Sequence, residues 1–178
     1  MVYNSKTYLP IDRIEMQWRK ERPDFDLNIQ KFLLQIYLYR AGHLVDAHFK
    51  RMCIGQFGIR SQDMRLLFAL RRHGAPFSMR PTALYQSLLV TSGAITKEVN
   101  RLEKLKLVRR VFDPARRRGF LVQLTDHGLV TADRAATMVS QNQSMDTPLA
   151  ALTNDQRALT LQFCVQIINA FQEFTPTP

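Results

Sequence analysis

The side chains between Lys97 and Arg118 are of the kinds that bind phosphate groups. This short segment holds nine Lys and Arg residues against three acids, so it carries +6 of the formal net charge of +10. A solvated helix face normally interleaves charges of both signs, so this concentration indicates a surface for a polyanion. Arginine is suited to paired phosphate oxygens because its planar guanidinium donates two parallel hydrogen bonds. The candidates of this type are Arg116, Arg117 and Arg118.

A second group of candidates shares one expected helix, residues 92–105. Its short polar and long basic side chains can reach phosphates and the edges of bases, and they are Ser92, Thr96, Lys97, Asn100 and Arg101. The same periodicity gives the helix a buried side made of Ile95, Val99 and Leu102. Arg101 has an alternative role, in which it pairs with Glu103 or Asp113 and holds the following loop.

Three short helical patterns and a strand-like segment position these candidates. The helices are expected at 61–73, 81–90 and 92–105, opened by Ser61, by Pro81 and by Thr91 or Ser92. The β-branched and aromatic segments 107–112 and 120–124 then flank the basic stretch 113–119, which predicts a two-stranded hairpin with a long basic tip. This order predicts a winged helix-turn-helix, whose last helix fits the major groove while the hairpin reaches backbone or minor groove.

Longer helices are expected on both sides of this core. The first covers 11–21 and ends before Pro23, and the second runs from a cap at Asp24 or Asp26 to about Ile54, where Gly55 and Gly58 stop it. Thr125 caps a helix reaching about residue 144, and a capping box at 153–156 opens the last one, to about 174. Their apolar stripes need a partner surface, for which the candidates are Leu33, Ile36, Phe163, Ile167 and Phe171.

Composition bounds the class of protein. The 178 residues suit a single domain, and no apolar run approaches the roughly 20 residues of a membrane span. The first ten residues lack a secretory signal, so we expect a cytoplasmic protein. Cys53 and Cys164 are interpreted as buried, reduced thiols. We expect no cofactor and no metal site, since His43 and His48 do not share a helix face.

Two other function classes are open to a basic chain of this size. Catalysis is not expected, because the sequence has no Gly-rich phosphate loop after a strand, no GxSxG and no HExxH. A non-specific architectural DNA binder or an RNA-binding module needs only the charge, although RNA modules display aromatics on strands and Phe112 and Phe120 are isolated. Competition by random duplex distinguishes a sequence-specific regulator from an architectural protein.

The order and spacing of five motifs resemble the MarR family of bacterial transcriptional regulators, over about residues 26–171. The motifs are residues 92–96, Arg101-Leu-Glu103, residues 107–110, Asp113-Pro with Arg117-Arg118, and Leu124-Thr125 with Gly128. The resemblance implies a mainly α fold with a small β-hairpin wing. It implies a homodimer whose terminal helices, about 11–56 and 126–174, interlock around winged regions at about 57–125. Double-stranded DNA with a pseudo-palindromic operator is the implied partner.

The resemblance also has departures and an implied ligand. Lys106 stands where members usually have Gly, so a non-Gly residue is expected in a left-handed turn. Arg116 stands where many members have an acid. Most members are repressors released by a small anionic or aromatic ligand, here expected to be an aromatic carboxylate. The residues available for it are Trp18, Tyr39, His43, Arg65 and Phe68, although aromatics at helical spacing also suit ordinary core packing. Relative to the urate-responsive branch, Arg65 and Glu98 have reversed charges and could pair.

Overall fold

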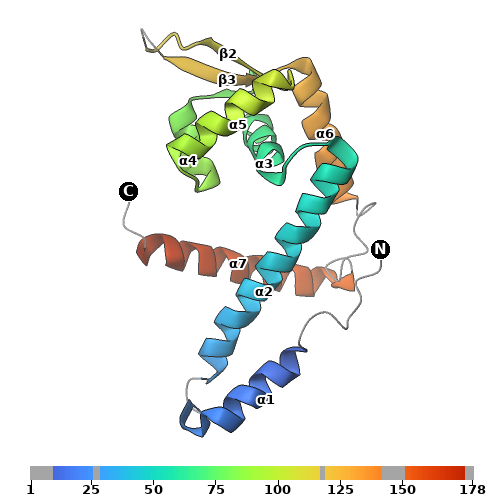
Figure 1. The fold of residues 1–178 in the computed structure, drawn as a ribbon, viewed down its shortest axis with the longest axis vertical. Helices are drawn as coiled ribbons and strands as arrows, with labels where there is room; N and C mark the ends of the chain where they lie inside the picture. The colour runs from blue at the N-terminus through green and yellow to red at the C-terminus, as the bar shows by residue number, and fades with distance from the viewer. Residues whose placement is uncertain (1–9, 26–28, 117–118, 142–150, 175–178) are drawn as a thin grey trace. The chain divides into compact units, whose positions relative to one another are not determined.

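The computed structural model describes residues 10–25, 29–116, 119–141 and 151–174. Most of them are helical (Figure 1), as α1 (Ile11–Glu21), a 3-10 turn (Pro23–Phe25), α2 (Ile29–Met52), a π-helical turn (Cys53–Phe57), α3 (Ser61–Arg72), α4 (Pro81–Leu88), α5 (Ser92–Lys104), α6 (Asp126–Ser140) and α7 (Asn154–Phe174). The strands are β1 (Ser78–Met79), β2 (Val108–Phe112) and β3 (Phe120–Leu124). This confirms the predicted mainly α fold with a small wing.

The chain divides into two compact units, Met1–Ser61 and Gln62–Pro178. In the first unit α1 and α2 meet through Trp18 and Phe32, whose rings stand edge to face with centroids 4.8 Å apart. The π-helical turn after α2 ends at Gly58, which adopts φ 65°, a left-handed conformation that glycine reaches without steric cost. Gly58 therefore ends the helical segment, as the sequence predicts.

Three threonines start helices in the second unit, as expected. Thr91 Oγ1 accepts a hydrogen bond from the backbone N–H of Ala94 at the start of α5. Thr125 Oγ1 accepts one from Gly128 N–H at the start of α6. Thr153 and Gln156 exchange reciprocal bonds of 2.9 and 3.2 Å, which is the predicted capping box of α7.

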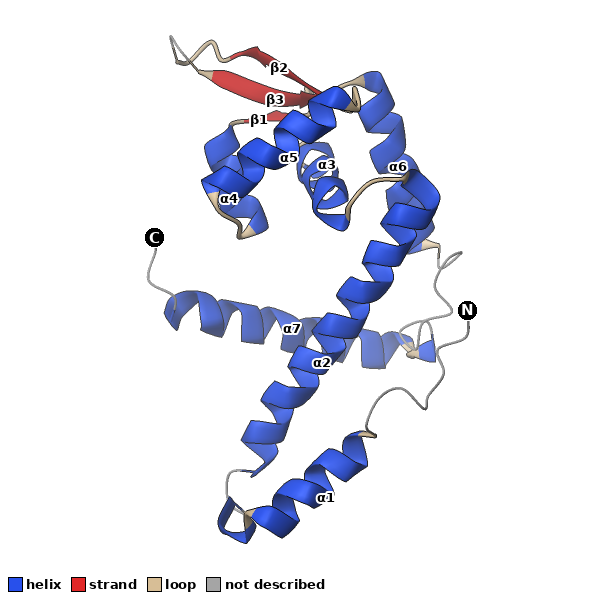
Figure 2. Ribbon diagram, viewed as in Figure 1, coloured by secondary structure: helices blue, strands red, loops and turns tan. Residues whose placement is uncertain are grey.

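The sheet of the second unit has three strands, so the predicted two-stranded hairpin is incomplete. The order is β1-β3-β2, all antiparallel, and the hairpin pairs Val108 with Leu124 at one end and Phe112 with Phe120 at the other (Figure 2). β1 adds Ser78 and Met79 opposite Gln123 and Val122. A strand of two residues is too short to show an alternating pattern, which is why periodicity misses it.

The core of the second unit lies between α3, α4, α5 and the sheet. It consists of fully or nearly fully buried apolar side chains, chiefly Met64, Leu66, Leu67, Leu70, Leu84, Ile95, Val99, Leu102, Val108 and Val122. The predicted buried side of α5, Ile95, Val99 and Leu102, is thus confirmed. Because α5 is anchored along one side, its opposite side is held in a fixed direction.

The junction between α5, β2 and α6 is close-packed. Lys106 adopts φ 57°, so the expected left-handed turn is formed without glycine. The Oγ1 of Thr125 donates to the carbonyl of Lys106 at 2.7 Å. A Cβ on Gly128 would lie 1.9 Å from the carbonyl oxygen of Leu107, so only glycine lets the first turn of α6 approach the chain entering β2.

Several expected boundaries and one burial differ from the structure. α2 begins at Ile29; of its two predicted caps, Asp24 lies in the 3-10 turn, and Asp26 lies outside the described residues. α6 ends at Ser140, not 144, and residues 142–150 are also outside them. Cys53 is buried as predicted, but Cys164 is exposed because α7 is covered on little of its surface. Among the described helices, none combines the length and hydropathy needed to span a membrane.

Candidate nucleic-acid interface

The exposed side of α5 carries most of the predicted contact residues. Ser92, Thr96, Lys97 and Asn100 are all exposed and lie opposite the buried side of the helix. Thr96 Oγ1 donates to the carbonyl of Ser92 at 3.1 Å, one turn earlier. The turn before α5 is fixed by Leu89, which adopts a left-handed conformation at φ 54°. The predicted polar side of the helix is therefore assembled on one surface.

Arg101 is held differently from its neighbours on α5. Its guanidinium donates to the carboxylate of Asp63 on α3, with Nε 2.8 and 3.0 Å from the two oxygens and Nη2 2.5 Å from Oδ1. The side chain of Asp63 is 1% exposed and that of Arg101 28%. Neither Glu103 nor Asp113, the two partners predicted from the sequence, forms an ion pair with Arg101. The pair ties α5 to α3, and a DNA contact by Arg101 stays a prediction.

Glu98 lies on the buried side of α5, beside this ion pair. Burial raises the pKa of the Glu98 carboxyl, and the neighbouring charge of Asp63 raises it further. The positive charges of Arg101 and Arg65 lower the same pKa to a smaller extent. Arg65 thus attracts Glu98, in the direction expected from their reversed charges. The helix therefore contains a carboxyl group whose charged form is disfavoured by the fold.

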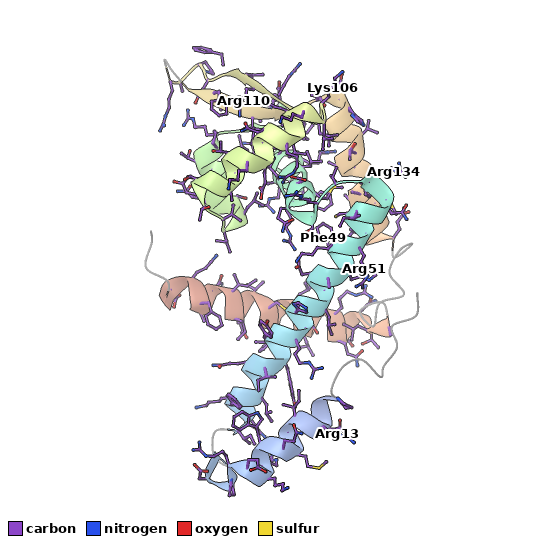
Figure 3. The ribbon with its side chains drawn as sticks, viewed as in Figure 1. Arg13, Phe49, Arg51, Lys106, Arg110 and Arg134 are labelled. Atoms are coloured by element: carbon purple, nitrogen blue, oxygen red, sulfur yellow. The ribbon has the colours of Figure 1, made fainter. Side chains whose placement is uncertain are left out.

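Arg110 of β2 connects α5 to the wing, and sequence reasoning did not single it out. Its Nη2 donates to Asn100 Oδ1 at 2.5 Å, and its Nη1 lies 2.9 Å from Glu103 Oε2. Its guanidinium carbon lies 5.0 Å from the centre of the Phe120 ring, within cation–π distance. Figure 3 shows Arg110 on the hairpin beside α5, and Lys106 where the helix turns into β2.

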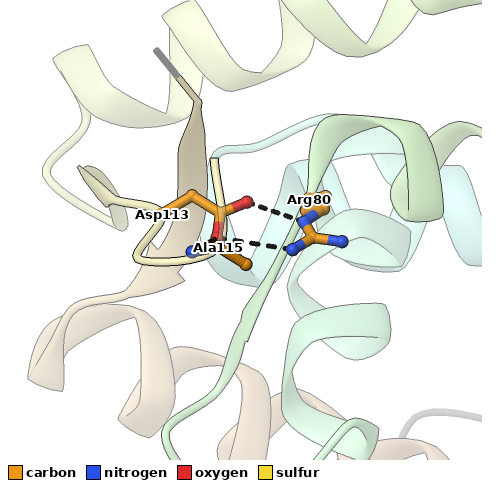
Figure 4. Close-up of polar contacts among 3 residues, drawn as sticks. All are labelled: Arg80, Asp113 and Ala115. Atoms are coloured by element: carbon orange, nitrogen blue, oxygen red, sulfur yellow. Dashed lines mark hydrogen bonds and ion pairs between the residues drawn. The ribbon is translucent and has the colours of Figure 1, made fainter. Parts of the chain in front are cut away.

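The base of the wing is fixed by a second ion pair. Asp113, at the end of β2, accepts from Arg80 Nε at 2.6 Å and from the backbone N–H of Ala115 at 3.0 Å (Figure 4). The hydrogen bond from Arg80 lowers the pKa of the Asp113 carboxyl, and the same bond raises the pKa of Arg80. Since Arg80 immediately precedes α4, this contact joins the start of that helix to the wing.

The tip of the wing presents positive charge. Arg116 is exposed, and its backbone N–H donates to the carbonyl of Asp113 at 3.1 Å, which folds the chain into a turn. Arg109, on β2, is also exposed and donates to Gln123 Oε1 at 2.9 Å. Arg117 and Arg118, the other predicted wing contacts, lie outside the described residues.

The residues predicted for a small ligand occur in both units. In the first, Trp18 is half-buried against Phe32, and the rings of Tyr39 and His43 are nearly parallel, with centroids 6.3 Å apart. In the second, α3 carries the exposed Arg65 and the half-buried Phe68. The structure brings Tyr39 and His43 together and leaves the ligand site a prediction.

Comparison with known proteins agrees with the geometry of the second unit. Residues 57–119 match the model of the MarR family. The HTH-type transcriptional regulator PecS of Dickeya dadantii is 29% identical over 136 residues, which is 76% of this chain and 80% of that protein.

Two solved structures have the same fold. Sco3205 from Streptomyces coelicolor, a MarR family regulator in complex with DNA, has a TM-score of 0.68 and 23% identity, covering 84% of this chain and 91% of that one. A mutant Escherichia coli MarR complexed with operator DNA has a TM-score of 0.63 and 21% identity, covering 85% and 96%. Together with the motifs around α5 and the wing, the match leads to one conclusion: residues 57–119 of this chain are similar to the MarR family.

Proposed function

We propose that this chain is a transcriptional regulator that binds double-stranded DNA in a sequence-specific manner. The observation that carries the proposal is the rigid alignment of a polar and basic helix face with a basic hairpin. Arg110 and the Arg101–Asp63 pair hold α5, and Arg80 holds the wing. A helix fits the major groove and a basic hairpin reaches the adjacent backbone. The DNA complexes of the two solved relatives support this use of the fold.

The proposed active form is a homodimer on a pseudo-palindromic operator, in the bacterial cytosol at the nucleoid. Residues 57–125 would bind DNA, and 11–56 with 126–174 would form the dimer. Of the predicted interface residues, Phe171 of α7 is 62% exposed within one chain and supports the dimer, whereas Leu33 is 4% exposed and is already covered within one chain. Half-sites would lie about 34 Å apart, one helical turn of DNA. Light scattering at micromolar concentration should give twice the 20.7 kDa chain mass, and a 20.7 kDa species would contradict the dimer.

We also propose a repressor whose DNA binding is weakened by a small aromatic carboxylate. Arg65 is the proposed partner of the carboxylate, and Trp18, Tyr39, His43 and Phe68 supply aromatic surface. A ligand releases DNA only if it binds the DNA-free shape more tightly. A panel of benzoates, cinnamates and urate should raise the melting temperature and dissociate the complex. If no member of the panel does either, the ligand proposal is wrong.

The decisive experiment for DNA recognition compares one wing variant with one helix variant. Arg116→Ala should weaken binding to all duplexes nearly alike and flatten the salt dependence by roughly 0.9 in log–log slope for each phosphate that the variant no longer neutralises. Asn100→Ala should weaken binding to the selected operator more than to a scrambled duplex, by about 1 kcal/mol or more. Both are measured by fluorescence anisotropy at two salt concentrations.

An architectural DNA-binding protein would give the opposite pattern in the same assay. Its wild-type form would lose the operator to excess random duplex, and the helix variant would bind all duplexes uniformly more weakly. Equal competition by operator and random duplex would therefore reject sequence-specific regulation.

A further inference from the structure

We infer that Asn100 reads DNA as a hydrogen-bond donor and that Arg110 imposes this role on it. The inference rests on the proposed function, since it states what kind of base edge the exposed side of α5 selects. Its basis is the bond from Arg110 Nη2 to Asn100 Oδ1, at 2.5 Å, which joins a wing residue to a contact residue of the helix.

The direction of this bond fixes which end of the Asn100 amide faces outward. A guanidinium has five N–H donors and no acceptor, so only the amide oxygen of Asn100 can face Arg110. The amide nitrogen then points away from Arg110. Within the part of the chain that the structure describes, this nitrogen makes no hydrogen bond, and the residue is exposed. Asn100 therefore presents two N–H donors toward the solvent side of α5.

Arg110 is itself held in three ways, so the orientation of Asn100 is stable. Glu103, one turn further along α5, pairs with Nη1 at 2.9 Å. Phe120 of β3 lies under the guanidinium with its ring centre 5.0 Å away. Arg110 also stands in the middle of the β2–β3 pairing, opposite Val122. Rotation of the Asn100 amide by 180° would place its NH₂ group against a cation with no acceptor, which is unfavourable.

The base preference follows from the donor pattern of the major groove. The usual contact of asparagine with adenine needs both ends of the amide, the oxygen for N6–H and the nitrogen for N7. Here the oxygen already accepts a charge-assisted bond, and the adenine N6 amino group would approach it next to a guanidinium. Guanine instead shows two acceptors, N7 and O6, which match two outward N–H groups. Asn100 should thus favour guanine over adenine.

The test is selection of duplexes from a randomised pool by the full-length protein and three variants. Wild type should enrich guanine at one position in each half-site. Asn100→Asp keeps an oxygen for Arg110 and replaces the outward donors with an acceptor, so preference at that position should move to cytosine, whose N4 amino group donates. The change should be about fivefold or more in relative affinity.

Arg110→Met and Arg109→Met form a matched pair of charge removals on adjacent residues of β2. Arg110→Met releases the amide, so adenine should approach guanine to within about twofold at the same position, because either end of the amide can now face the base. Arg109 donates to Gln123 on β3 rather than to α5, so Arg109→Met should lower affinity for all duplexes without changing the preferred bases. Melting temperatures of all variants check that they are folded.

The outcomes separate this inference from the function on which it rests. If wild type enriches a motif but Asn100→Asp leaves every position unchanged, or if the position that responds is adenine in wild type, the donor role is refuted. If Arg109→Met changes base preference as much as Arg110→Met does, the positioning role of Arg110 is refuted. If wild type enriches no motif at all, sequence-specific binding itself is wrong, and the inference is rejected together with it.

Discussion

Replacing Asp63 with Ala removes the buried half of the ion pair that ties α5 to α3. The Asp63 side chain is 1% exposed, so its removal leaves the Arg101 guanidinium without its hydrogen-bonded partner and with only the nearby Glu98 carboxyl to offset its charge. Breaking a buried pair in this way costs about 3–5 kcal/mol. Two features place the value at about 3 kcal/mol, the lower end of that range. Arg101 is 28% exposed and can turn toward water. Removing Asp63 also removes the repulsion between the Asp63 and Glu98 carboxylates.

For a chain of this size a destabilisation of about 3 kcal/mol corresponds to roughly 6–12 °C in melting temperature. The assay is thermal and urea unfolding followed by circular dichroism at one fixed protein concentration, because a dimer's stability depends on concentration. Arg101→Ala and the double variant complete a thermodynamic cycle. The double variant should be less destabilised than the sum of the single variants. A cost below about 1 kcal/mol for Asp63→Ala, or strict additivity, would refute the pairing as a stabilising contact.

Three further predictions concern backbone strain and pH. Lys106→Gly should raise stability by about 1 kcal/mol, since glycine adopts φ 57° without strain, and an unchanged urea midpoint would contradict this. Gly128→Ala should cost about 3 kcal/mol, because its Cβ would overlap the Leu107 carbonyl; a stable variant would show that α6 can shift. Glu98→Gln should be more stable than wild type at neutral pH and similar in acid. Because the pKa of Glu98 is raised in the folded state, the wild type loses stability as pH rises through that pKa. The urea midpoints of the variant and the wild type should therefore agree below about pH 4 and differ increasingly above it.

One acidic group should act in the opposite direction. The pKa of Asp113 is lowered, so its contribution to stability is present above the ordinary aspartate range and lost as pH falls. Asp113→Asn should therefore flatten the acid side of the stability profile. The same urea titrations across pH measure this effect. If the decline in urea midpoint at acid pH is the same in Asp113→Asn as in the wild type, the Arg80 contact does not stabilise the wing.

The polar side of α5 and the basic hairpin could be predicted because both leave local signals. A helix with Ile95 and Val99 buried at four-residue spacing turns the residues on its opposite side outward, and two strands flanking a basic turn define the wing. The helix starts at Thr91, Thr125 and Thr153 could also be predicted, because a cap is a contact between residues three positions apart in the sequence.

The contacts that hold the interface were not predictable in the same way. Asp63 and Arg101 are 38 residues apart, and Arg110 approaches Asn100 only because β2 folds back along α5. The sequence offered Glu103 and Asp113 as partners for Arg101 because they are near in the chain. In the fold they pair with Arg110 and Arg80 instead. Partner choice among many arginines depends on packing, which periodicity and charge counts do not contain.

The strand order β1-β3-β2 has a consequence for solubility. It leaves β2 as a bordering strand, with backbone groups on one side that another copy's strand could in principle pair with. Arg109 and Arg110 occupy consecutive positions of β2 and project to opposite faces of the pleat. Arg110 is paired with Glu103, so two copies brought edge to edge would set like charges against each other on the face of Arg109. Valine or threonine at both positions would suit a strand equally well and remove that repulsion. Arginine at an edge strand therefore disfavours edge-to-edge pairing of two copies.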